Sequence, residues 1–298
     1  MDAAHRCRCI PLPDGRRIGA AEYGDPAGRP VFYFHGFPGS RIEARLAHEA
    51  AARAGIRLVA LDRPGYGASD PQPGRTLHDW AEDVARCADA LGLSRFAVLG
   101  LSGGGPYAAA VAAALPGRVR AAGLLSPLGP AHLPELARAM RRHQRLGFAA
   151  ARRAPGLTAA LAVPVVAVTK RFERAAFALM AAALPPPDRA VLRGTPAAGI
   201  LLASFREAVR PGAAGLASDL AIYARPWGLD PGKIRVPALV WHGGADRTVP
   251  PAMGRHLAAA IPGCRARLFP GEGHFSLAVR HMDEILADLA AAAGRGPR

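Results

Sequence analysis

The feature that most constrains the fold is a group of glycines directly after an apolar run. Residues 96–99 read Phe-Ala-Val-Leu, and residues 100–105 read Gly-Leu-Ser-Gly-Gly-Gly. A Gly-x-Ser-x-Gly pattern is typical of a sharp turn between a buried strand and a helix, where any larger side chain at the flanking positions would collide with the turn. The pattern therefore predicts that a buried strand ends at Ser102 and that a helix begins there.

The same glycines also fit a second pattern. Residues 103–108 match a loose Gly-x-Gly-x-x-Ala dinucleotide-binding fingerprint, which is a weak signal by itself. Such a site requires a carboxylate about 20 residues further on, at the end of the next strand, to bind a ribose hydroxyl. The next predicted strand ends in Leu-Leu-Ser-Pro-Leu at residues 124–128, without an acidic residue. We therefore interpret the glycines as a serine turn and expect no cofactor.

Strands and helices are predicted to alternate along most of the chain. Short apolar runs predict strands at residues 17–23, 31–34, 58–61, 96–99, 121–125, 238–241 and 266–269. Apolar residues at helical spacing predict helices near residues 42–54, 77–91, 103–115, 252–260 and 282–289. We expect the first two strands to form a hairpin, and Thr76 with Asp79 to cap the second helix. This order predicts an α/β fold with a mostly parallel, doubly wound sheet of about eight strands.

A long helical stretch interrupts this alternation after the sixth strand. Residues 129–231 are rich in alanine and arginine, and they are too many for a loop in a compact domain. We therefore expect a helical cap subdomain at 129–231, inserted into a core domain made of residues 1–128 and 232–298. Its position in the chain would place it over the strand ends, where open α/β sheets bind their ligands.

The chain is strongly basic, with a formal net charge of +15. Between Arg138 and Arg171 there are eight basic residues and no Asp or Glu. This excess is either a solvated helix face in a chain biased toward arginine, or a surface that attracts anionic substrates or membranes. No nucleic-acid-binding motif accompanies it, so we expect no nucleic-acid partner.

Other features bear on where the protein resides. The sequence contains no run of about 18 apolar residues, and its start leads into no hydrophobic signal region. The four cysteines form no convincing disulfide or zinc pattern, so we expect reduced thiols and no metal site. These observations predict a cytoplasmic protein without stable membrane insertion, and they leave its oligomeric state open.

Two later loops each carry a residue that could activate the serine. Asp246 follows the strand ending at Trp241, and His274 follows the next strand. A serine hydroxyl is a weak nucleophile unless a base takes its proton, and the base needs an acid to orient it. The chain order Ser, Asp, His is that of the α/β-hydrolases.

Five motifs, in the family's order, make this chain resemble the α/β-hydrolases over nearly its whole length apart from the insertion. They are His-Gly-Phe-Pro-Gly-Ser at 35–40, Asp-Arg-Pro-Gly-Tyr-Gly-Ala-Ser at 62–69, the serine turn, His-Gly-x-x-Asp at 242–246, and Gly-His at 273–274. The resemblance implies that Ser102 is the nucleophile, His274 the general base and then acid, and Asp246 its orienting carboxylate. It also implies that the backbone N–H groups of Phe37 and Gly103 form the oxyanion hole.

Several other polar residues belong to these motifs or lie close to them. We expect His35 and His242 to hold loops, Asp62 and Asp70 to fix a glycine-rich turn, and Glu272 to be a solvated charge. None of them is assigned a catalytic role.

The resemblance implies a serine hydrolase that works through an acyl-enzyme. We expect it to hydrolyse a carboxylic ester in a small or medium apolar substrate, which is its one expected partner. The same three residues also support amide or C–C bond hydrolysis, cofactor-free perhydrolysis and cyanohydrin cleavage. Dehalogenases and epoxide hydrolases of this fold resemble the chain less, because they place aspartate where Ser102 stands. A ligand-binding protein that retains the pocket without catalysis is the alternative from another class.

Overall fold

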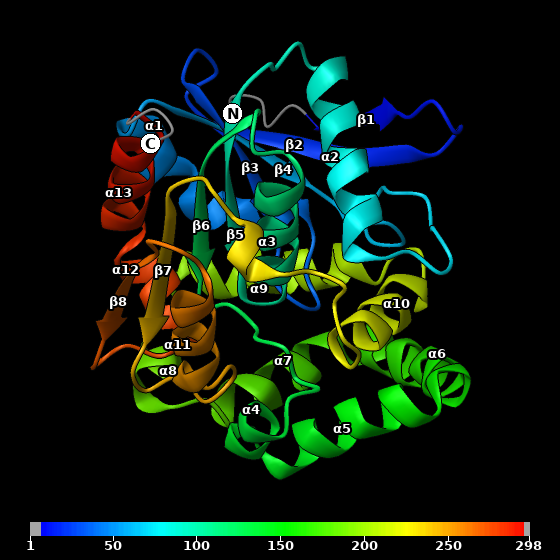
Figure 1. Ribbon diagram of the computed structural model, residues 1–298. Helices are drawn as coiled ribbons and strands as arrows, with labels where there is room; N and C mark the ends of the chain where they lie inside the picture. Colours follow the sequence, from blue (N-terminus) through cyan, green and yellow to red (C-terminus); the bar gives the residue numbers. More distant parts are fainter. Residues whose placement is uncertain (1–6, 295–298) are drawn as a thin grey trace.

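Eight strands form one mixed sheet in the computed structural model, which describes residues 7–294. The strand order across the sheet is β1-β2-β4-β3-β5-β6-β7-β8 (Figure 1). The strands are β1 (Cys7–Pro11), β2 (Arg17–Gly24), β3 (Arg29–Phe34), β4 (Ile56–Leu61), β5 (Phe96–Leu101), β6 (Val119–Leu125), β7 (Ala238–Gly243) and β8 (Arg265–Phe269). Neighbours from β4 to β8 are parallel, and β2 is antiparallel to β1 and β4. The predicted fold class is confirmed.

The predicted hairpin of the first two strands is wrong. β2 pairs with β1 and β4, whereas β3 lies between β4 and β5. The reason is that β3 is apolar on both of its faces: Phe32 and Phe34 enter one side of the core, and Val31 and Tyr33 enter the other. Such a strand is stable only in the middle of a sheet that is covered on both sides. β1 was not predicted from the sequence, because most of its residues are exposed and it therefore has no apolar run.

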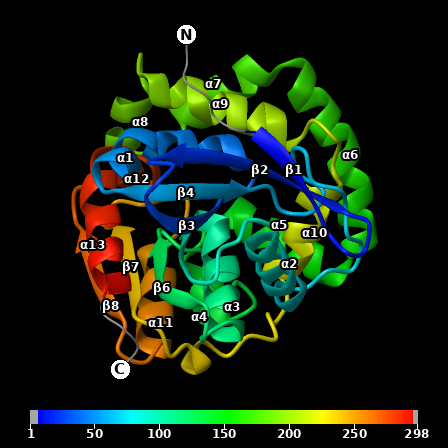
Figure 2. The same cartoon turned by 90° about the horizontal axis from the view of Figure 1, so that it is seen from above.

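Helices cover both faces of the sheet (Figure 2). One face packs against α2 (Leu77–Ala90), α3 (Gly105–Ala114) and α11 (Pro251–Ala260). The other packs against α1 (His48–Arg53), α12 (His274–Arg280) and α13 (Met282–Gly294). The predicted cap of α2 is confirmed, since the Thr76 side chain accepts from the N–H groups of His78 and Asp79. The segment predicted as one helix at 42–54 is instead a 3₁₀-helix, Arg41–Ala47, followed by α1.

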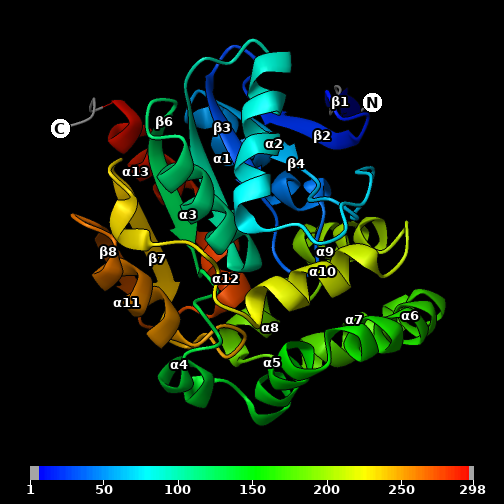
Figure 3. The ribbon, with the colours of Figure 1, turned by 45° about the vertical axis from the view of Figure 1, so that its right-hand side comes forward.

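Seven helices stand between β6 and β7 and lie together beyond one end of the sheet (Figures 1 and 3). They are α4 (Pro134–Ala139), α5 (Arg142–Arg153), α6 (Pro155–Arg171), α7 (Glu173–Ala182), α8 (Pro186–Leu192), α9 (Pro196–Ala208) and α10 (Ala214–Tyr223). We call this set the helical insertion. It has two small apolar clusters, one around Leu192 and one around Val166, while Leu136 and Tyr223 join the main core.

Within residues 7–294, no helix combines the length and apolar character needed to span a lipid bilayer. The prediction that the chain start leads into no hydrophobic signal region rests on residues 1–6. These residues lie outside the described residues.

Candidate active site

Ser102 follows the last residue of β5 and has a positive φ of 54°, as a sharp strand-to-helix turn requires. Only a few per cent of residues other than glycine adopt such a φ. The surrounding glycines are sterically required. A Cβ on Gly100 would lie 2.3 Å from the carbonyl oxygen of Gly104, and a Cβ on Gly104 would lie 2.1 Å from that of Phe34. The predicted serine turn is confirmed.

Asp246 and His274 meet although they come from loops after two different strands, β7 and β8. His274 Nδ1 lies 2.7 Å from Asp246 Oδ2, and both side chains are buried. The second carboxylate oxygen, Oδ1, accepts hydrogen bonds from the N–H groups of Thr248 and Val249, both at 2.8 Å. Asp246 is thus fixed by its own loop and can orient the imidazole through Nδ1.

The charges of this pair favour an imidazolium beside a carboxylate. Burial by itself lowers the pKa of His274, but the charge of Asp246 and the hydrogen bond to it outweigh burial and raise the pKa above the usual 6.5. Burial by itself raises the pKa of Asp246, but His274 and His242 hold it well below 3.8. The site can therefore take up a proton on His274 and stabilise the resulting charge.

The two residues predicted to supply oxyanion donors lie against each other. A Cβ on Gly103 would approach the Cβ of Phe37 to 2.7 Å. A Cβ on Gly36, the neighbour of Phe37, would lie 3.6 Å from the Cβ of Ser102. The backbone that carries both N–H groups therefore passes directly beside the serine.

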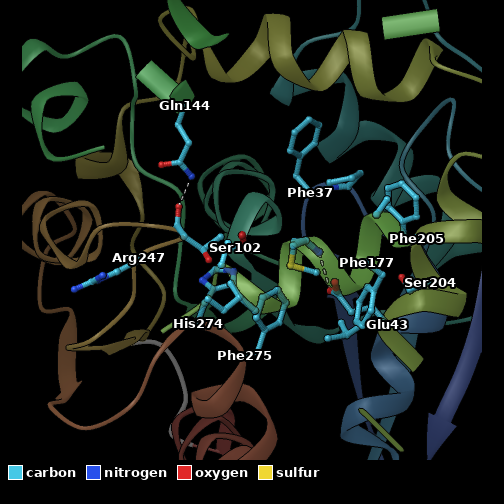
Figure 4. A pocket seen from close by; sticks show the side chains of 18 of the residues that line it. Phe37, Glu43, Ser102, Gln144, Phe177, Ser204, Phe205, Arg247, His274 and Phe275 are labelled. Carbon is cyan, nitrogen blue, oxygen red and sulfur yellow. Dashed lines mark hydrogen bonds between the residues drawn. The ribbon is translucent and has the colours of Figure 1, made fainter. Parts of the chain in front are cut away.

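Ser102, His274 and Phe37 line one cavity of about 500 Å³ (Figure 4). The helical insertion supplies much of its wall. The apolar lining includes Phe37, Leu101, Ala176, Phe177, Met180, Ala183, Leu184, Leu201, Phe205 and Phe275. Polar groups are fewer, and the amide of Gln144 among them is held by a 2.9 Å hydrogen bond to the carbonyl oxygen of Thr248. A mostly apolar cavity with a few placed polar groups is typical of small-molecule sites.

Comparison with known proteins identifies the family. A family model described as alpha/beta hydrolase fold matches residues 29–280. The chain belongs to this family. A putative non-heme haloperoxidase of Mycobacterium phage D29 is 30% identical over 248 residues, covering 74% of this chain and 86% of that protein.

Two further similarities extend the comparison. A non-heme chloroperoxidase of Streptomyces lividans is 39% identical over 123 residues, or 41% of this chain and 45% of that protein, so the match spans less than half of that relative. A solved structure, an alpha/beta hydrolase fold protein from Nakamurella multipartita, has a TM-score of 0.67 and 26% identity, covering 97% of this chain and 100% of that one.

Sequence reasoning missed a buried charge network beneath the site of this α/β-hydrolase family member. Arg63 is fully buried and donates to the carbonyl oxygens of His35 and Gly36. Its charge is balanced by Asp219 of α10, which lies 3.0 Å from Nε and also accepts from Arg75. Although burial opposes ionisation, these two arginines hold the pKa of Asp219 well below its usual range. Arg63 belongs to the motif at residues 62–69, but nothing in the sequence distinguished Asp219.

Tyr223, four residues after Asp219 on α10, extends this network to the serine turn. Its hydroxyl lies 2.9 Å from the carbonyl oxygen of Gly103 and 3.1 Å from Asp219. The network therefore contacts the backbone of both predicted oxyanion segments, at Gly36 and at Gly103.

Two buried carboxylates near the cavity were also missed. Glu43 Oε1 accepts from the Tyr33 hydroxyl at 2.8 Å and from the Gly36 N–H at 2.7 Å, and burial raises the pKa of Glu43. Asp188 of α8 accepts from the backbone N–H groups that begin α12. Neither residue belongs to a pattern that marks it in the sequence.

The residues expected to hold loops do so. Asp62 accepts from the N–H of Ala68, and Asp70 from that of Arg17. His35 Nε2 accepts from the N–H of Arg63, and His242 Nε2 lies 3.0 Å from the carbonyl oxygen of Val249.

The expectation that Glu272 is a solvated charge is wrong. Its side chain is mostly buried and interacts with Arg280 and His281, at the C-terminal end of α12.

Proposed function

We propose that the protein is a serine hydrolase that cleaves carboxylic esters through an acyl-enzyme. The observation that carries this proposal is the buried pair of His274 and Asp246 on the same cavity as the strained Ser102. A buried imidazole whose pKa is raised by a carboxylate, on the same cavity as a hydroxyl held at a strained turn, matches the requirements for nucleophilic catalysis.

The reaction begins when Ser102 Oγ attacks the ester carbonyl carbon and His274 Nε2 takes the hydroxyl proton. The carbonyl oxygen becomes an oxyanion that accepts from the N–H groups of Phe37 and Gly103, each worth a factor of roughly 10² to 10³ in rate. The C–O bond then breaks, and His274 gives its proton to the departing alcohol. Asp246 stays ionised throughout and stabilises the imidazolium.

Deacylation repeats these steps with water as the nucleophile. His274 Nε2 takes a proton from water, whose oxygen attacks the acyl carbon and forms a second oxyanion at Phe37 and Gly103. When this intermediate collapses, the proton returns to Ser102 Oγ and the carboxylic acid leaves. The enzyme is then restored with no cofactor required.

The cavity supports a small or medium apolar substrate. Its volume of about 500 Å³ and its aromatic and aliphatic lining favour an apolar acyl or alcohol group. Because most of that lining comes from residues between β6 and β7, we propose that the helical insertion acts as a cap subdomain that selects the substrate.

Perhydrolysis is a second candidate function. The relatives from Streptomyces lividans and from phage D29 are named as a chloroperoxidase and a haloperoxidase of the non-heme type. If hydrogen peroxide replaces water in deacylation, the same steps release a peroxy acid and regenerate Ser102. Measuring peroxy acid alongside carboxylic acid, with peroxide present, separates the two functions.

The test is hydrolysis of p-nitrophenyl esters of increasing acyl length by the wild type and by Ser102→Ala. We expect turnover that is lost in the variant, together with labelling of the wild type alone by a fluorophosphonate probe. An unlabelled wild type without turnover, yet able to bind ester analogues, would instead identify a ligand-binding protein. Turnover that persists in Ser102→Ala would refute the assignment of the nucleophile.

A further inference from the structure

One helix of the insertion is apolar around its whole circumference and yet lies on the surface. On α6, only Ala162 and Val166 are buried, and they pack in a cluster with Val209 and Ala213. Its other large apolar side chains, Leu157, Leu161, Val163, Val165 and Val168, are 57–62% exposed. A helix that is apolar on every side is normally covered on every side. The exposed sides of α6 are therefore unexplained by the fold of the chain alone.

Neighbouring helices extend this exposed region. Leu146 on α5, Phe172 after α6, and Leu179 and Met180 on α7 are exposed as well, Leu179 by 76%. Helices α5, α6 and α7 follow one another at the outer edge of the insertion (Figure 3). We call these nine side chains, five on α6 and four around it, the apolar surface. Large apolar side chains that gather on an exposed surface are typical of interaction sites.

Basic residues flank the apolar surface at both ends of α6. Arg152 and Arg153 precede the helix, Lys170 and Arg171 end it, and all four are exposed. In the part of the chain that the structure describes, none of the four forms an ion pair with a carboxylate. The sequence from residue 138 to 171 also contains no acidic residue. The region thus combines apolar bulk with uncompensated positive charge.

This combination fits an anionic lipid surface better than a second copy of the chain. Pairing two copies through the same surface would bring together like charges on a protein of net charge +15. Helix α6 has 17 residues and does not qualify as a membrane span. Because α6 is apolar around its circumference and has basic side chains at both ends, it would lie along the lipid interface, with its apolar side chains among the acyl chains and the basic side chains toward the anionic headgroups.

The apolar surface is also continuous with the cavity. Met180 belongs to both, and Thr169 of α6 and Phe177 of α7 line the cavity from the same helices. We propose that the apolar surface docks on membranes rich in anionic phospholipid, with α6 along the interface and the cavity wall of α7 facing the lipid. Docking by these side chains does not require Ser102, so the proposed docking can be tested independently of the proposed hydrolysis.

The test is co-sedimentation of the full chain with two kinds of vesicle, phosphatidylcholine alone and phosphatidylcholine with one third phosphatidylglycerol. We expect binding to the anionic vesicles, weakened by high salt. A charge variant in which Arg152, Arg153, Lys170 and Arg171 become Gln should bind at least about tenfold more weakly, since it removes four positive charges that attract the anionic headgroups. An apolar variant, Leu157→Ser with Leu161→Ser and Val165→Ser, should also lose binding.

Matched controls carry the same chemical changes elsewhere. Exposed arginines of the core outside the insertion, Arg95, Arg235, Arg255 and Arg265, become Gln, and the exposed Leu268 becomes Ser. These controls should bind like the wild type. The proposal is overturned if the charge variant and its control lose binding equally, or if the wild type binds neither vesicle. It is also overturned if the apolar variant only abolishes a dimer seen by sedimentation velocity. The charge variant keeps the test decisive should the apolar variant fail to fold.

Discussion

The carboxylate of Asp188 accepts a hydrogen bond from the backbone N–H of His274 at 3.0 Å. It also accepts from the N–H groups of Phe275 at 2.9 Å and Ser276 at 2.8 Å, so that it caps the first turn of α12. Asp188 belongs to α8 of the helical insertion, whereas His274 follows the last strand of the sheet. A residue of the insertion thereby fixes the backbone from which the proposed catalytic base projects.

Replacing Asp188 with Ala should lower both stability and turnover. Buried N–H groups left without a partner cost about 1–3 kcal/mol in unfolding free energy, and a displaced His274 should lower kcat more than it raises KM. Asp188→Asn retains an acceptor oxygen and should recover part of both. Urea unfolding and ester kinetics measure these effects. Asp230→Ala, which removes a side-chain cap from the N–H of Gly232 far from the cavity, is the control that should keep full turnover.

The rate should fall at acid pH, because His274 must be neutral to accept a proton. Asp246 raises the pKa of His274, so the acid limb of kcat/KM should lie above pH 6.5. Asp246→Asn removes the charge that raises this pKa. Its acid limb should therefore move to lower pH while its maximal rate drops steeply. A profile that keeps its position in the variant would show that another group controls the limb.

Stability should depend on pH through the same pair, with opposite signs for its two members. The lowered pKa of Asp246 adds stability above its unfolded value of 3.8, and this is lost as pH falls. The raised pKa of His274 adds stability below 6.5, and this is lost as pH rises through the folded value. Unfolding in urea should therefore show the largest advantage of the wild type over Asp246→Asn between these two pH values.

Asp219→Asn should destabilise the protein strongly. It leaves the buried guanidinium groups of Arg63 and Arg75 without their counter-charge, and breaking a buried ion pair typically costs about 3–5 kcal/mol. Turnover should also fall, because Arg63 holds the carbonyl oxygen of Gly36 beside the proposed oxyanion donor. Chemical denaturation of this variant is compared with that of Asp283→Asn, which breaks an exposed pair with Arg53 and should change stability far less.

Gly104→Ala tests the steric requirement of the serine turn. Its Cβ would lie 2.1 Å from the carbonyl oxygen of Phe34, so the strand or the turn must move at a cost of about 1–3 kcal/mol. Reactivity toward a fluorophosphonate should drop with it. Gly117→Ala, where an added Cβ meets nothing within 4 Å, should leave both the melting temperature and the labelling unchanged. Equal effects in the two variants would contradict the steric explanation.

Much of this site could be predicted because its signals are local. Gly100 is required by a contact within the turn itself, with the carbonyl oxygen of Gly104, and Asp246 follows a strand with a clear apolar run, β7, although Gly104 is required by Phe34 of the neighbouring strand. Glu43, by contrast, occupies a position whose importance depends on Gly36 and Tyr33 approaching it in the folded chain. No pattern among the neighbouring residues in the sequence predicts that contact.

The sequence by itself determined the alternating α/β order, the place of the insertion and the turn at Ser102, because short-range sterics and apolar periodicity act between residues close in the chain. Only the tertiary structure decided that β3 lies between β4 and β5, and that Asp188 and Asp219 support the site. Asp188 meets His274 across 86 positions, and Asp219 meets Arg63 across 156. The packing of the insertion on the sheet decides these pairings. A buried charge is stable only beside an opposite charge or a hydrogen-bonding group, and the fold determines where that partner lies.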